Sequence, residues 1–287
     1  MLIVITGATG CLGRAVLPEL LAAGHRIVAV VRPGSSLADE TDCETVAMDL
    51  GRPLEIERLP ARCDAIVHLA QSREHRRFPD AALDIFRINT SAAVELARYA
   101  AVADAGQFVF ASTGTVYEPG AAPIPETGPV APPSFYAASK LAAEHLLAPF
   151  GEAMAVATMR LFYLYGPGLR AMLISELAQR LRDGAPIDLQ GAEGMLLSPT
   201  YSGDVARVVR RALEEKWSGV YNVASSDIVS LKTLTKAIAE VLELEAVFRQ
   251  SADTASPPVL PDLRKLRMQA GQFKFTPLLE GLRQTFR

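Results

Sequence analysis

The fold is decided by the first stretch of the chain, MLIVITGATGCLGRAVLPELLAAGHRIVAVVR (residues 1–32). An apolar run is followed by Gly7, Gly10 and Gly13, and the last glycine lies inside a segment over 12–23 whose apolar residues recur with helical spacing. Glycines between a strand and a helix let the backbone turn sharply and approach a pyrophosphate at the positive end of the helix. The spacing alone leaves two interpretations open: a phosphate-binding loop or a tight turn without a ligand.

The composition is that of a globular protein. With 287 residues, of which 49% are hydrophobic, the chain can bury one large core or a core with a smaller satellite. Its formal net charge of -3 disfavours nucleic acid and anionic membranes as partners. No stretch approaches the roughly 20 apolar residues that a bilayer span needs, and no basic leader precedes the first apolar run. We therefore expect a soluble, unprocessed protein that binds a small molecule rather than nucleic acid or membrane.

The cysteines and histidines indicate neither disulfides nor a metal site. The three cysteines form no C-x-x-C motif, and their odd number is typical of a compartment where thiols stay reduced. The four histidines are scattered, without the i, i+4 pairing of a zinc site. We expect a cytoplasmic location and no bound metal.

Short apolar runs alternate with helical patterns along the first two thirds of the chain. The runs span residues 2–5, 27–31, 65–69, 108–111 and 156–161, and the helical segments span 12–23, 82–103 and 136–147. Strands without polar alternation are typical of sheets covered on both faces. Strand followed by helix, repeated with right-handed crossovers, predicts an α/β protein with the doubly wound parallel sheet of the Rossmann fold.

After Tyr165 the pattern changes, which predicts a second, smaller α/β domain for substrate binding. We expect a helix over 170–182, a strand over 187–190, a glycine-broken hairpin, a helix over 231–244 and an irregular segment over 251–267. The predicted division assigns 1–165 to the dinucleotide-binding domain, to which 199–225 return, and 166–198 with 226–287 to the smaller domain.

Polar residues of one further segment suggest acid/base chemistry. Tyr136 and Lys140 stand four apart at the start of a predicted helix, so their side chains share one face. An ammonium ion beside a phenol lowers the pKa of the phenol, which can then transfer protons near neutral pH; an accidental surface pair is the alternative. Ser112 and Thr113 end a predicted strand, where their hydroxyls could hold a substrate oxygen at the carboxyl edge of the sheet.

Six motifs together resemble the extended short-chain dehydrogenase/reductases, the group that contains nucleotide-sugar epimerases and dehydratases. They are GATGCLG at 7–13, MDL at 48–50, VHLA at 67–70, STGTVY at 112–117, YAASK at 136–140 and RLFYLYGPG at 160–168. Their order and spacing match over nearly the whole chain. The resemblance favours the phosphate-binding interpretation of the glycine loop.

The resemblance implies a role for each matching position. The three glycines of the first loop would face the cofactor pyrophosphate, Asp49 and Leu50 the adenine, and Ala70 would line the cofactor cleft. Thr113 would hydrogen-bond the reacting oxygen. Tyr136 would be the general acid/base, and Lys140 would hold the nicotinamide ribose and depress the pKa of the tyrosine.

One further position carries two interpretations. Asn89 matches an asparagine that supports the site in relatives, and it is equally explained as a satisfied polar residue within a helix.

The end of the second predicted strand favours NADP over NAD. Relatives that use NAD usually carry an acid there, which bonds the ribose 2′-hydroxyl. This chain has Val31 at that place, followed by Arg32 and then Ser35 and Ser36. A guanidinium can accept a 2′-phosphate and stack on adenine. The alternative is a solvated arginine beside an unphosphorylated ribose.

The substrate half departs further from the family pattern. Gly114 and Thr115 stand where dehydratases place an Asp-Glu pair, which disfavours dehydration. Tyr163 replaces an asparagine, and Leu197 stands near the place of an arginine, both of which normally hold a nucleotide diphosphate. These changes disfavour an ordinary UDP- or dTDP-sugar.

Two loops are candidates for bordering the substrate. The segment QSREHRRFPD brings Arg73, His75, Arg76 and Arg77 near the cleft, either as an anion site or as a solvated charged loop. The proline-rich segment over 118–134 is long enough to form a lid or wall over the site.

The sequence therefore favours an NAD(P)-dependent oxidoreductase or epimerase acting on a secondary alcohol or ketone, including that of a sugar nucleotide. Two alternatives stay open: an NADPH-dependent ketoreductase on a non-sugar molecule, and a catalytically silent dinucleotide-binding regulator. The predicted helices over 82–103 and 136–147 carry apolar positions beyond one core-facing stripe. As in relatives, we expect these helices to pair two copies into a homodimer.

Overall fold

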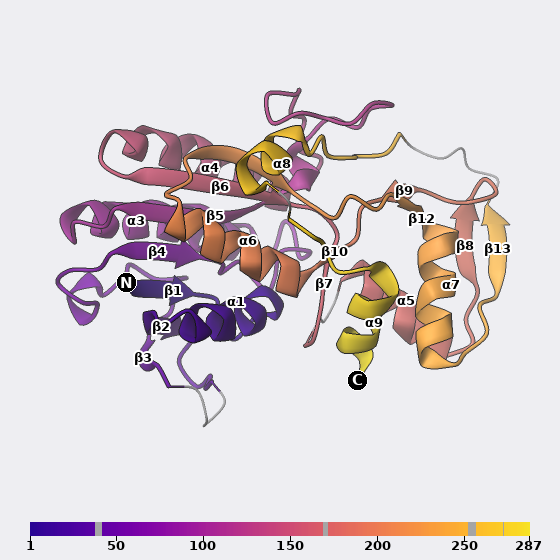
Figure 1. Ribbon diagram of the computed structural model, residues 1–287, viewed down its shortest axis with the longest axis horizontal. Coiled ribbons are helices and arrows are strands. Elements are labelled where there is room, and N and C mark those ends of the chain that lie inside the picture. The colour runs from indigo at the N-terminus through magenta and orange to yellow at the C-terminus, as the bar shows by residue number, and fades with distance from the viewer. Residues whose placement is uncertain (38–41, 169–171, 252–256, 272) are drawn as a thin grey trace.

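The computed structural model describes residues 1–37, 42–168, 172–251, 257–271 and 273–287. Its centre is a seven-stranded sheet in the order β11-β6-β5-β4-β1-β2-β3, in which every neighbouring pair is parallel (Figure 1). The strands are β1 Leu2–Thr6, β2 Arg26–Val31, β3 Glu44–Ala47, β4 Ala65–His68, β5 Gln107–Thr113, β6 Ala155–Leu161 and β11 Gly219–Val223. The predicted doubly wound parallel sheet is confirmed.

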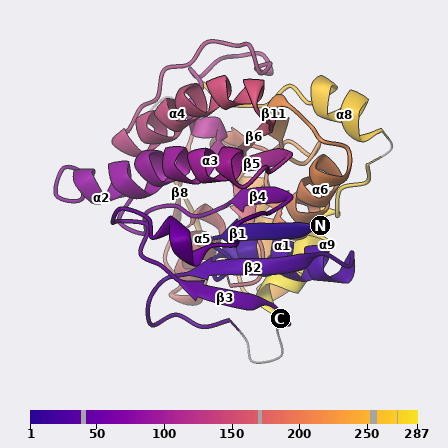
Figure 2. The ribbon, with the colours of Figure 1, turned by 90° about the vertical axis from the view of Figure 1, so that its left-hand side faces the viewer.

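Helices cover both faces of this sheet (Figure 2). On one face α1 (Cys11–Ala22) packs against α6 (Ser202–Glu214). The other face carries α3 (Ala92–Val102) and α4 (Phe135–Leu147). Two apolar cores result, one on each face of the sheet. Short 3-10 helices at Ile56–Arg58, Gly114–Val116 and Ala148–Glu152 connect these elements.

The helix predicted over 82–103 is interrupted. It consists of α2 (Ala82–Phe86), a π-helical turn over Arg87–Ser91 and then α3. Asn89 lies in the π-helical turn and is fully buried. Such turns widen the helix locally and are frequent at functional sites.

A smaller unit lies beside the carboxyl ends of the central strands, on the right in Figure 1. It contains α5 (Leu173–Arg182), α7 (Leu231–Leu242), α9 (Leu278–Phe286) and the parallel pair of β8 (Ile187–Gln190) with β13 (Phe248–Ser251). Two further pairs are short: β7 Leu164–Tyr165 with β10 Thr200–Tyr201, and β9 Leu196–Leu197 with β12 Val229–Ser230. This unit has an apolar core of its own.

The smaller unit corrects some of the predicted boundaries. The first two residues of the helix predicted over 170–182 lie outside the described residues, and α5 begins at Leu173. The prediction of an irregular segment over 251–267 is wrong at both ends, because Ser251 ends β13 and α8 spans Arg264–Ala270. Residues 252–256 of that segment also lie outside the described residues. Helix α8 forms because Leu266 and Ala270 pack into the core beside β11.

The assignment of residue ranges to two domains stays a prediction. Among the described residues, no helix has both the length and the apolarity needed to cross a bilayer.

Candidate active site

The glycine loop between β1 and α1 packs so closely against neighbouring backbone that its positions require glycine. Gly7 has a φ of +76°, and a Cβ at this position would lie 2.7 Å from the backbone nitrogen of Ala70. A Cβ on Gly13 would lie 2.2 Å from the carbonyl oxygen of Gly7. Gly10 caps α1 without a side-chain hydrogen bond, so the first amides of the helix are left to a ligand or solvent. This cradle fits the pyrophosphate of a dinucleotide.

The ends of β2 and β3 lie beside this loop. The amide of Met48 donates to the carbonyl of Val31 at 2.8 Å, which fixes the two strand ends together. Val31 is buried, and the Arg32 side chain that follows it is exposed. Asp49 accepts a hydrogen bond from the amide of Gly51 at 2.9 Å, and Leu50 packs partly buried against the core. These residues place one cationic and one carboxylate side chain at the same edge of the sheet.

Tyr136 and Lys140 lie on the first two turns of α4. Ser134 caps this helix by accepting a hydrogen bond from the amide of Ala137 at 3.2 Å. The hydroxyl of Tyr136 donates to Oε1 of Gln71 at 3.0 Å, and its ring centroid lies 5.3 Å from that of His75. Both partners come from the loop after β4, so this loop and α4 form the two walls around the phenol.

The ammonium group of Lys140 is buried. Its Nζ lies 4.3 Å from the centroid of the Phe110 ring on β5, and burial lowers its pKa to about 7, an effect that Glu144 opposes. His68, at the end of β4, stacks on the same Phe110 ring at 5.7 Å. Burial first, and then the charge of Lys140, lowers the pKa of His68 to about 3, so this imidazole is neutral.

The expected lowering of the Tyr136 pKa is wrong for this structure. Burial raises the pKa of Tyr136 to about 12, and a hydrogen-bonding contact with Thr113 only partly opposes this rise. Desolvation therefore outweighs the attraction that a neighbouring positive charge would supply. The same contact places Thr113 and Tyr136 together at the carboxyl end of β5.

The turn after Thr113 leaves no room for an acid. Thr113 accepts hydrogen bonds at its Oγ1 from the amide of Thr115 at 3.2 Å and lies 2.9 Å from the hydroxyl of Thr115. A Cβ on Gly114 would lie 2.4 Å from the ring of Phe162. The ring thus fills the space that the first acid of a dehydratase pair would need.

Ser112 is not part of this group, which corrects its expected role beside the substrate. Its hydroxyl donates to Glu144 of α4 within the buried interior. Because successive side chains of a strand point to opposite faces, Ser112 and Thr113 cannot both line the same cleft.

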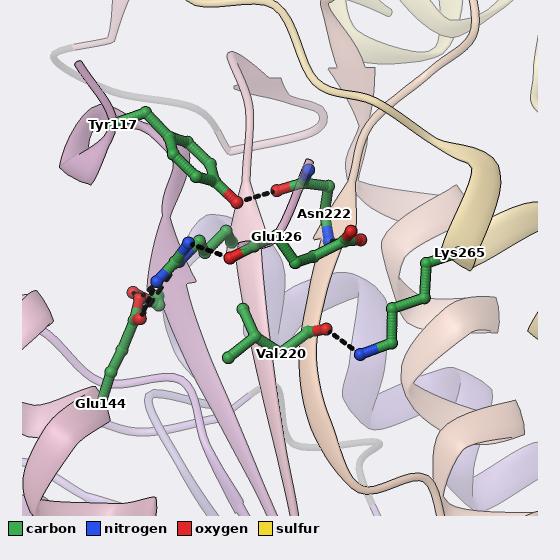
Figure 3. A network of polar contacts seen from close by, with 8 residues as sticks. Tyr117, Glu126, Glu144, Val220, Asn222 and Lys265 are labelled. Atoms are coloured by element: carbon green, nitrogen blue, oxygen red, sulfur yellow. Dashed lines mark hydrogen bonds and ion pairs between the residues drawn. The ribbon is translucent and has the colours of Figure 1, made fainter. Parts of the chain in front are cut away.

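The segment over 118–134 is bonded to two strands of the central sheet. Arg160 of β6 pairs with Glu144 and donates through Nη1 to the carbonyl of Glu126 at 3.1 Å (Figure 3). The amide of Asn222 on β11 donates to Oε1 of Glu126 at 2.9 Å, and the hydroxyl of Tyr117 donates to Oδ1 of Asn222 at 2.7 Å (Figure 3). Buried polar contacts at both strands therefore hold the segment in place.

Backbone pairing with residues 258–262 fixes the segment further. The amide of Ile124 donates to the carbonyl of Leu260 at 2.8 Å, and the amide of Asp262 donates to the carbonyl of Ile124 at 2.9 Å. The amide of Gly120 likewise donates to the carbonyl of Pro258 at 3.1 Å. The segment is thus paired with residues 258–262, and its role as a lid or wall of the substrate site stays a prediction.

Comparison with known proteins supplies the context for this geometry. The family model described as the NAD dependent epimerase/dehydratase family matches residues 3–224. The chain belongs to this family. It is an NAD(P)-dependent enzyme of the extended short-chain dehydrogenase/reductase type, as its sequence resemblance predicts.

Two curated members of the family illustrate its range. UDP-glucuronic acid decarboxylase 1 of Xenopus tropicalis is 23% identical over 303 residues, which cover 99% of this chain and 70% of that protein. The dTDP-4-dehydrorhamnose reductase of Mycolicibacterium smegmatis is 27% identical over 235 residues, which cover 79% of this chain and 65% of that protein. The chain thus spans 65% to 70% of the length of these two relatives.

Solved structures of the family agree with the fold over the whole chain. MoeE5 in complex with UDP-glucuronic acid and NAD is 28% identical, with a TM-score of 0.84 over 99% of this chain and 97% of that one. The WbmH enzyme of Bordetella bronchiseptica in complex with NAD+ is 25% identical, with a TM-score of 0.85 over 99% and 96%.

The substrate side of the cleft departs from the family pattern in packing as well as in sequence. Leu197 is fully buried in the apolar core of the smaller unit. Tyr163 has a φ of +39°, a strained conformation for a bulky residue, and packs against two of the three cores. Neither side chain presents a charge or amide that could hold a diphosphate.

The basic loop after β4 is largely neutralised. Arg76 forms an ion pair with Glu176 of α5, and Arg77 pairs with Glu74 at 3.0 Å. Arg73 is exposed, and His75 lies beside Tyr136. The pair between Arg76 and Glu176 also joins the loop to α5 of the smaller unit.

Sequence reasoning missed Gln71, although it stands directly after the VHLA motif. Its contact with Tyr136 joins residues 65 positions apart, which no local spacing encodes. The pairing of Glu144 with Arg160 was also missed; its only signal was a carboxylate one turn after Lys140 on the same helix face.

Proposed function

We propose that the chain is an NAD(P)-dependent oxidoreductase or epimerase that interconverts a secondary alcohol and a ketone, including that of a sugar nucleotide. The observation that supports this most is the contact between Tyr136 and Thr113 at the carboxyl end of β5, with Lys140 one turn along the same helix as Tyr136. Two hydroxyls at that edge are suited to proton transfer at a carbinol oxygen. These intact groups also argue against a silent dinucleotide-binding regulator.

The chain's own residues have distinct tasks in this proposal. The glycine loop binds the pyrophosphate, Asp49 and Leu50 contact the adenine, Ala70 lines the cleft, and Lys140 holds the nicotinamide ribose. When bound, the nicotinamide supplies hydride acceptance and donation at the substrate carbon. Thr113 holds the reacting oxygen, and Tyr136 takes or returns its proton.

The choice of cofactor is proposed from one side chain. Arg32 is exposed at the end of β2, directly after buried Val31, where it can meet a 2′-phosphate. We therefore propose NADP, with NAD as the alternative, which the NAD complexes of the related structures favour.

Two substrate classes are proposed. Relatives whose structures contain UDP-glucuronic acid or UDP-glucose favour a sugar nucleotide and an epimerase. The apolar packing of Tyr163 and Leu197 favours the second candidate, an NADPH-dependent ketoreductase on a non-sugar molecule. Arg73 and Arg76 are the candidate contacts for an anionic group of either substrate.

We also propose a homodimer and keep the cytoplasmic location as a prediction. Leu83 and Phe86 of α2 are 67% and 49% exposed, and Leu146 of α4 is 50% exposed, which is more apolar surface than a solvated helix face needs. Sedimentation showing only a 30.8 kDa species at micromolar concentration would contradict the dimer.

The fate of the cofactor tests the proposed reaction. Purified protein is freed of small molecules, its retained nucleotide is quantified, and NAD(P)H oxidation is followed with ketones and with sugar nucleotides. Retained cofactor with sugar epimerisation supports the epimerase, and stoichiometric NADPH consumption with a ketone supports the ketoreductase. Dinucleotide binding without turnover of either class contradicts both.

A further inference from the structure

We propose that Gln71 is a positioning residue for Tyr136: its side-chain carbonyl holds and orients the phenol proton, and Asn89 fixes the two residues opposite each other. This inference rests on the proposed acid/base role of Tyr136. It goes further by naming Gln71 as the group that accepts the hydrogen bond of the Tyr136 hydroxyl before the substrate binds.

The contact between the two side chains is direct. The hydroxyl of Tyr136 donates to Oε1 of Gln71 at 3.0 Å. Both side chains are partly buried. An amide oxygen can only accept a hydrogen bond, so the phenol carries its proton while this contact exists. The neutral phenol gives up this contact when it donates its proton to a ketone oxygen, which leaves a phenolate; in the reverse direction the phenolate accepts the proton of a substrate hydroxyl and the contact forms again.

The buried side-chain amide of Asn89 links the backbone beside Gln71 to the helix that carries Tyr136. Oδ1 of Asn89 accepts from the amide of Ser72 at 2.9 Å, and Ser72 is the residue next to Gln71. Nδ2 of Asn89 donates to Oγ of Ser139 at 2.9 Å. That hydroxyl in turn donates to the carbonyl of Tyr136 itself at 2.7 Å.

This arrangement explains why Asn89 is buried in a π-helical turn. Asn89 and Ser72 are fully buried, and Ser139 is nearly so. The hydroxyl of Ser72 also donates to Asp84 of α2, which ties the loop to the start of the same helix. Because buried polar groups in such a chain are satisfied by one another, the distance between Gln71 and Tyr136 is determined by the network.

Several other polar residues lie on the elements around the phenol. Lys140 lies one turn along α4, with Glu144 one turn further, and Thr113 contacts the phenol from β5. His75 faces the ring from the loop after β4, and its Nδ1 lies 3.2 Å from the carbonyl of Ser72. A hydrogen-bond acceptor stabilises the neutral phenol, so Gln71 opposes the contact with Thr113, which lowers the pKa of Tyr136.

The ionisation of Tyr136 is the quantity to measure, because it does not require turnover. The full chain is labelled with ¹³C at the ζ-carbon of tyrosine, and the Tyr136 signal is assigned by its loss in Tyr136→Phe. Titration then compares wild type with Gln71→Leu, which keeps the size but removes the acceptor, and with Gln71→Glu, which places a stronger acceptor there.

We expect opposite shifts from the two variants. Gln71→Leu should lower the pH of Tyr136 ionisation by roughly half to one pH unit, the size expected for one lost hydrogen bond. Gln71→Glu should raise it. Ser139→Ala, which removes the link to Asn89, should move it downward by less. Asp80→Asn, a charge change at an exposed position of the same loop, should leave it unchanged.

An upward or zero shift in Gln71→Leu would overturn the proposal, as would equal shifts in Gln71→Leu and Asp80→Asn. Circular dichroism of each variant confirms folding, and Gln71→Glu supplies the test if Gln71→Leu does not fold. The two proposals fail separately. If Tyr136→Phe keeps its turnover, the proposed catalytic role is lost even where the titration still responds to Gln71.

Discussion

Arg160 and Glu144 form an ion pair inside the protein, with side-chain exposures of only 7% and 4%. Nη2 of Arg160 lies 2.6 Å from Oε2 of Glu144, and its Nε lies 3.1 Å from the same oxygen. The pair joins β6 to α4, the helix that carries Tyr136 and Lys140. A buried charge without its partner is costly, so the two residues hold α4 against the sheet only as a pair.

Removing one member of this pair should destabilise the protein strongly. We expect Glu144→Ala to lower the free energy of unfolding by about 3–5 kcal/mol, because it leaves the Arg160 charge buried and uncompensated. Urea denaturation followed by circular dichroism measures the loss. As a matched control, Arg62→Ala breaks an ion pair with Asp104 whose partners are 83% and 79% exposed, and should change stability little.

A double substitution gives the prediction its sharpest test. Glu144→Leu combined with Arg160→Met removes both charges and should recover much of the stability lost in Glu144→Ala. If Glu144→Ala is as stable as Arg62→Ala, the ion pair between Arg160 and Glu144 does not hold the helix.

Two glycines with similar backbone angles allow the cofactor loop to be tested. Gly7→Ala places a Cβ 2.7 Å from the backbone of Ala70, whereas Gly24→Ala, at a φ of +78°, meets no atom within 4 Å. Each substitution costs roughly 1–2 kcal/mol of backbone strain. Only Gly7→Ala should also weaken NAD(P)H binding, which fluorescence titration of the nucleotide measures. Equal affinities in the two variants would show that the loop does not contact the cofactor.

Much of the fold follows from the sequence because the central strands are buried on both faces and therefore read as apolar runs. The strand Glu44–Ala47 escaped this pattern, since three of its four residues are not buried. Helix α8 escaped because prolines precede it and only Leu266 and Ala270 anchor it. Edge and anchoring elements depend on tertiary contacts that local periodicity does not record.

The candidate site was predicted where its geometry is local and missed where it is not. Tyr136 and Lys140 share a helix face, which their spacing encodes. The Tyr136 pKa could not be predicted, because its burial depends on the distant loop that contributes Gln71. The assignment of Ser112 was wrong for a reason visible in the sequence: it stands next to Thr113 in a strand and must face the other way.

The buried Lys140 side chain is expected to lower the free energy of unfolding, although the proposed function requires it. Burial lowers its pKa from 10.5 to about 7, which corresponds to about 5 kcal/mol. Lys140→Met removes this cost but also loses the contact with Phe110, worth about 1 kcal/mol. Between these two pKa values the unfolded chain binds more protons than the folded one, so stability rises with pH across that window.

The variant is tested by its unfolding at several pH values. Lys140→Met should be more stable than wild type near pH 7, with the difference shrinking as pH rises from about 7 toward 10.5. It should also lose activity and cofactor affinity. A variant less stable than wild type at every pH would mean that the ammonium is not desolvated.

Cofactor choice is tested at Arg32. If its guanidinium meets a 2′-phosphate, Arg32→Ala should weaken NADPH binding by about 1–3 kcal/mol and leave NADH binding nearly unchanged. Calorimetric titration of the same protein with both nucleotides measures the difference. Arg58→Ala serves as a control, because Arg58 is exposed and pairs with Glu55 at 2.9 Å, away from the residues proposed to bind the cofactor. Equal losses for NADPH and NADH in Arg32→Ala would contradict the proposed preference.

The proton-transfer role is tested by Tyr136→Phe. This substitution keeps the ring beside His75 and deletes only the hydroxyl, so fold and cofactor affinity should survive. The loss of general acid/base catalysis typically costs about 10²–10⁴-fold in rate. Turnover is measured against pH for wild type and variant, with cofactor affinity determined in parallel. Tyr117→Phe is the matched control, since its hydroxyl contacts Asn222 away from the proposed reacting oxygen. A Tyr136→Phe variant that retained most of the wild-type turnover would show that the proton comes from another group.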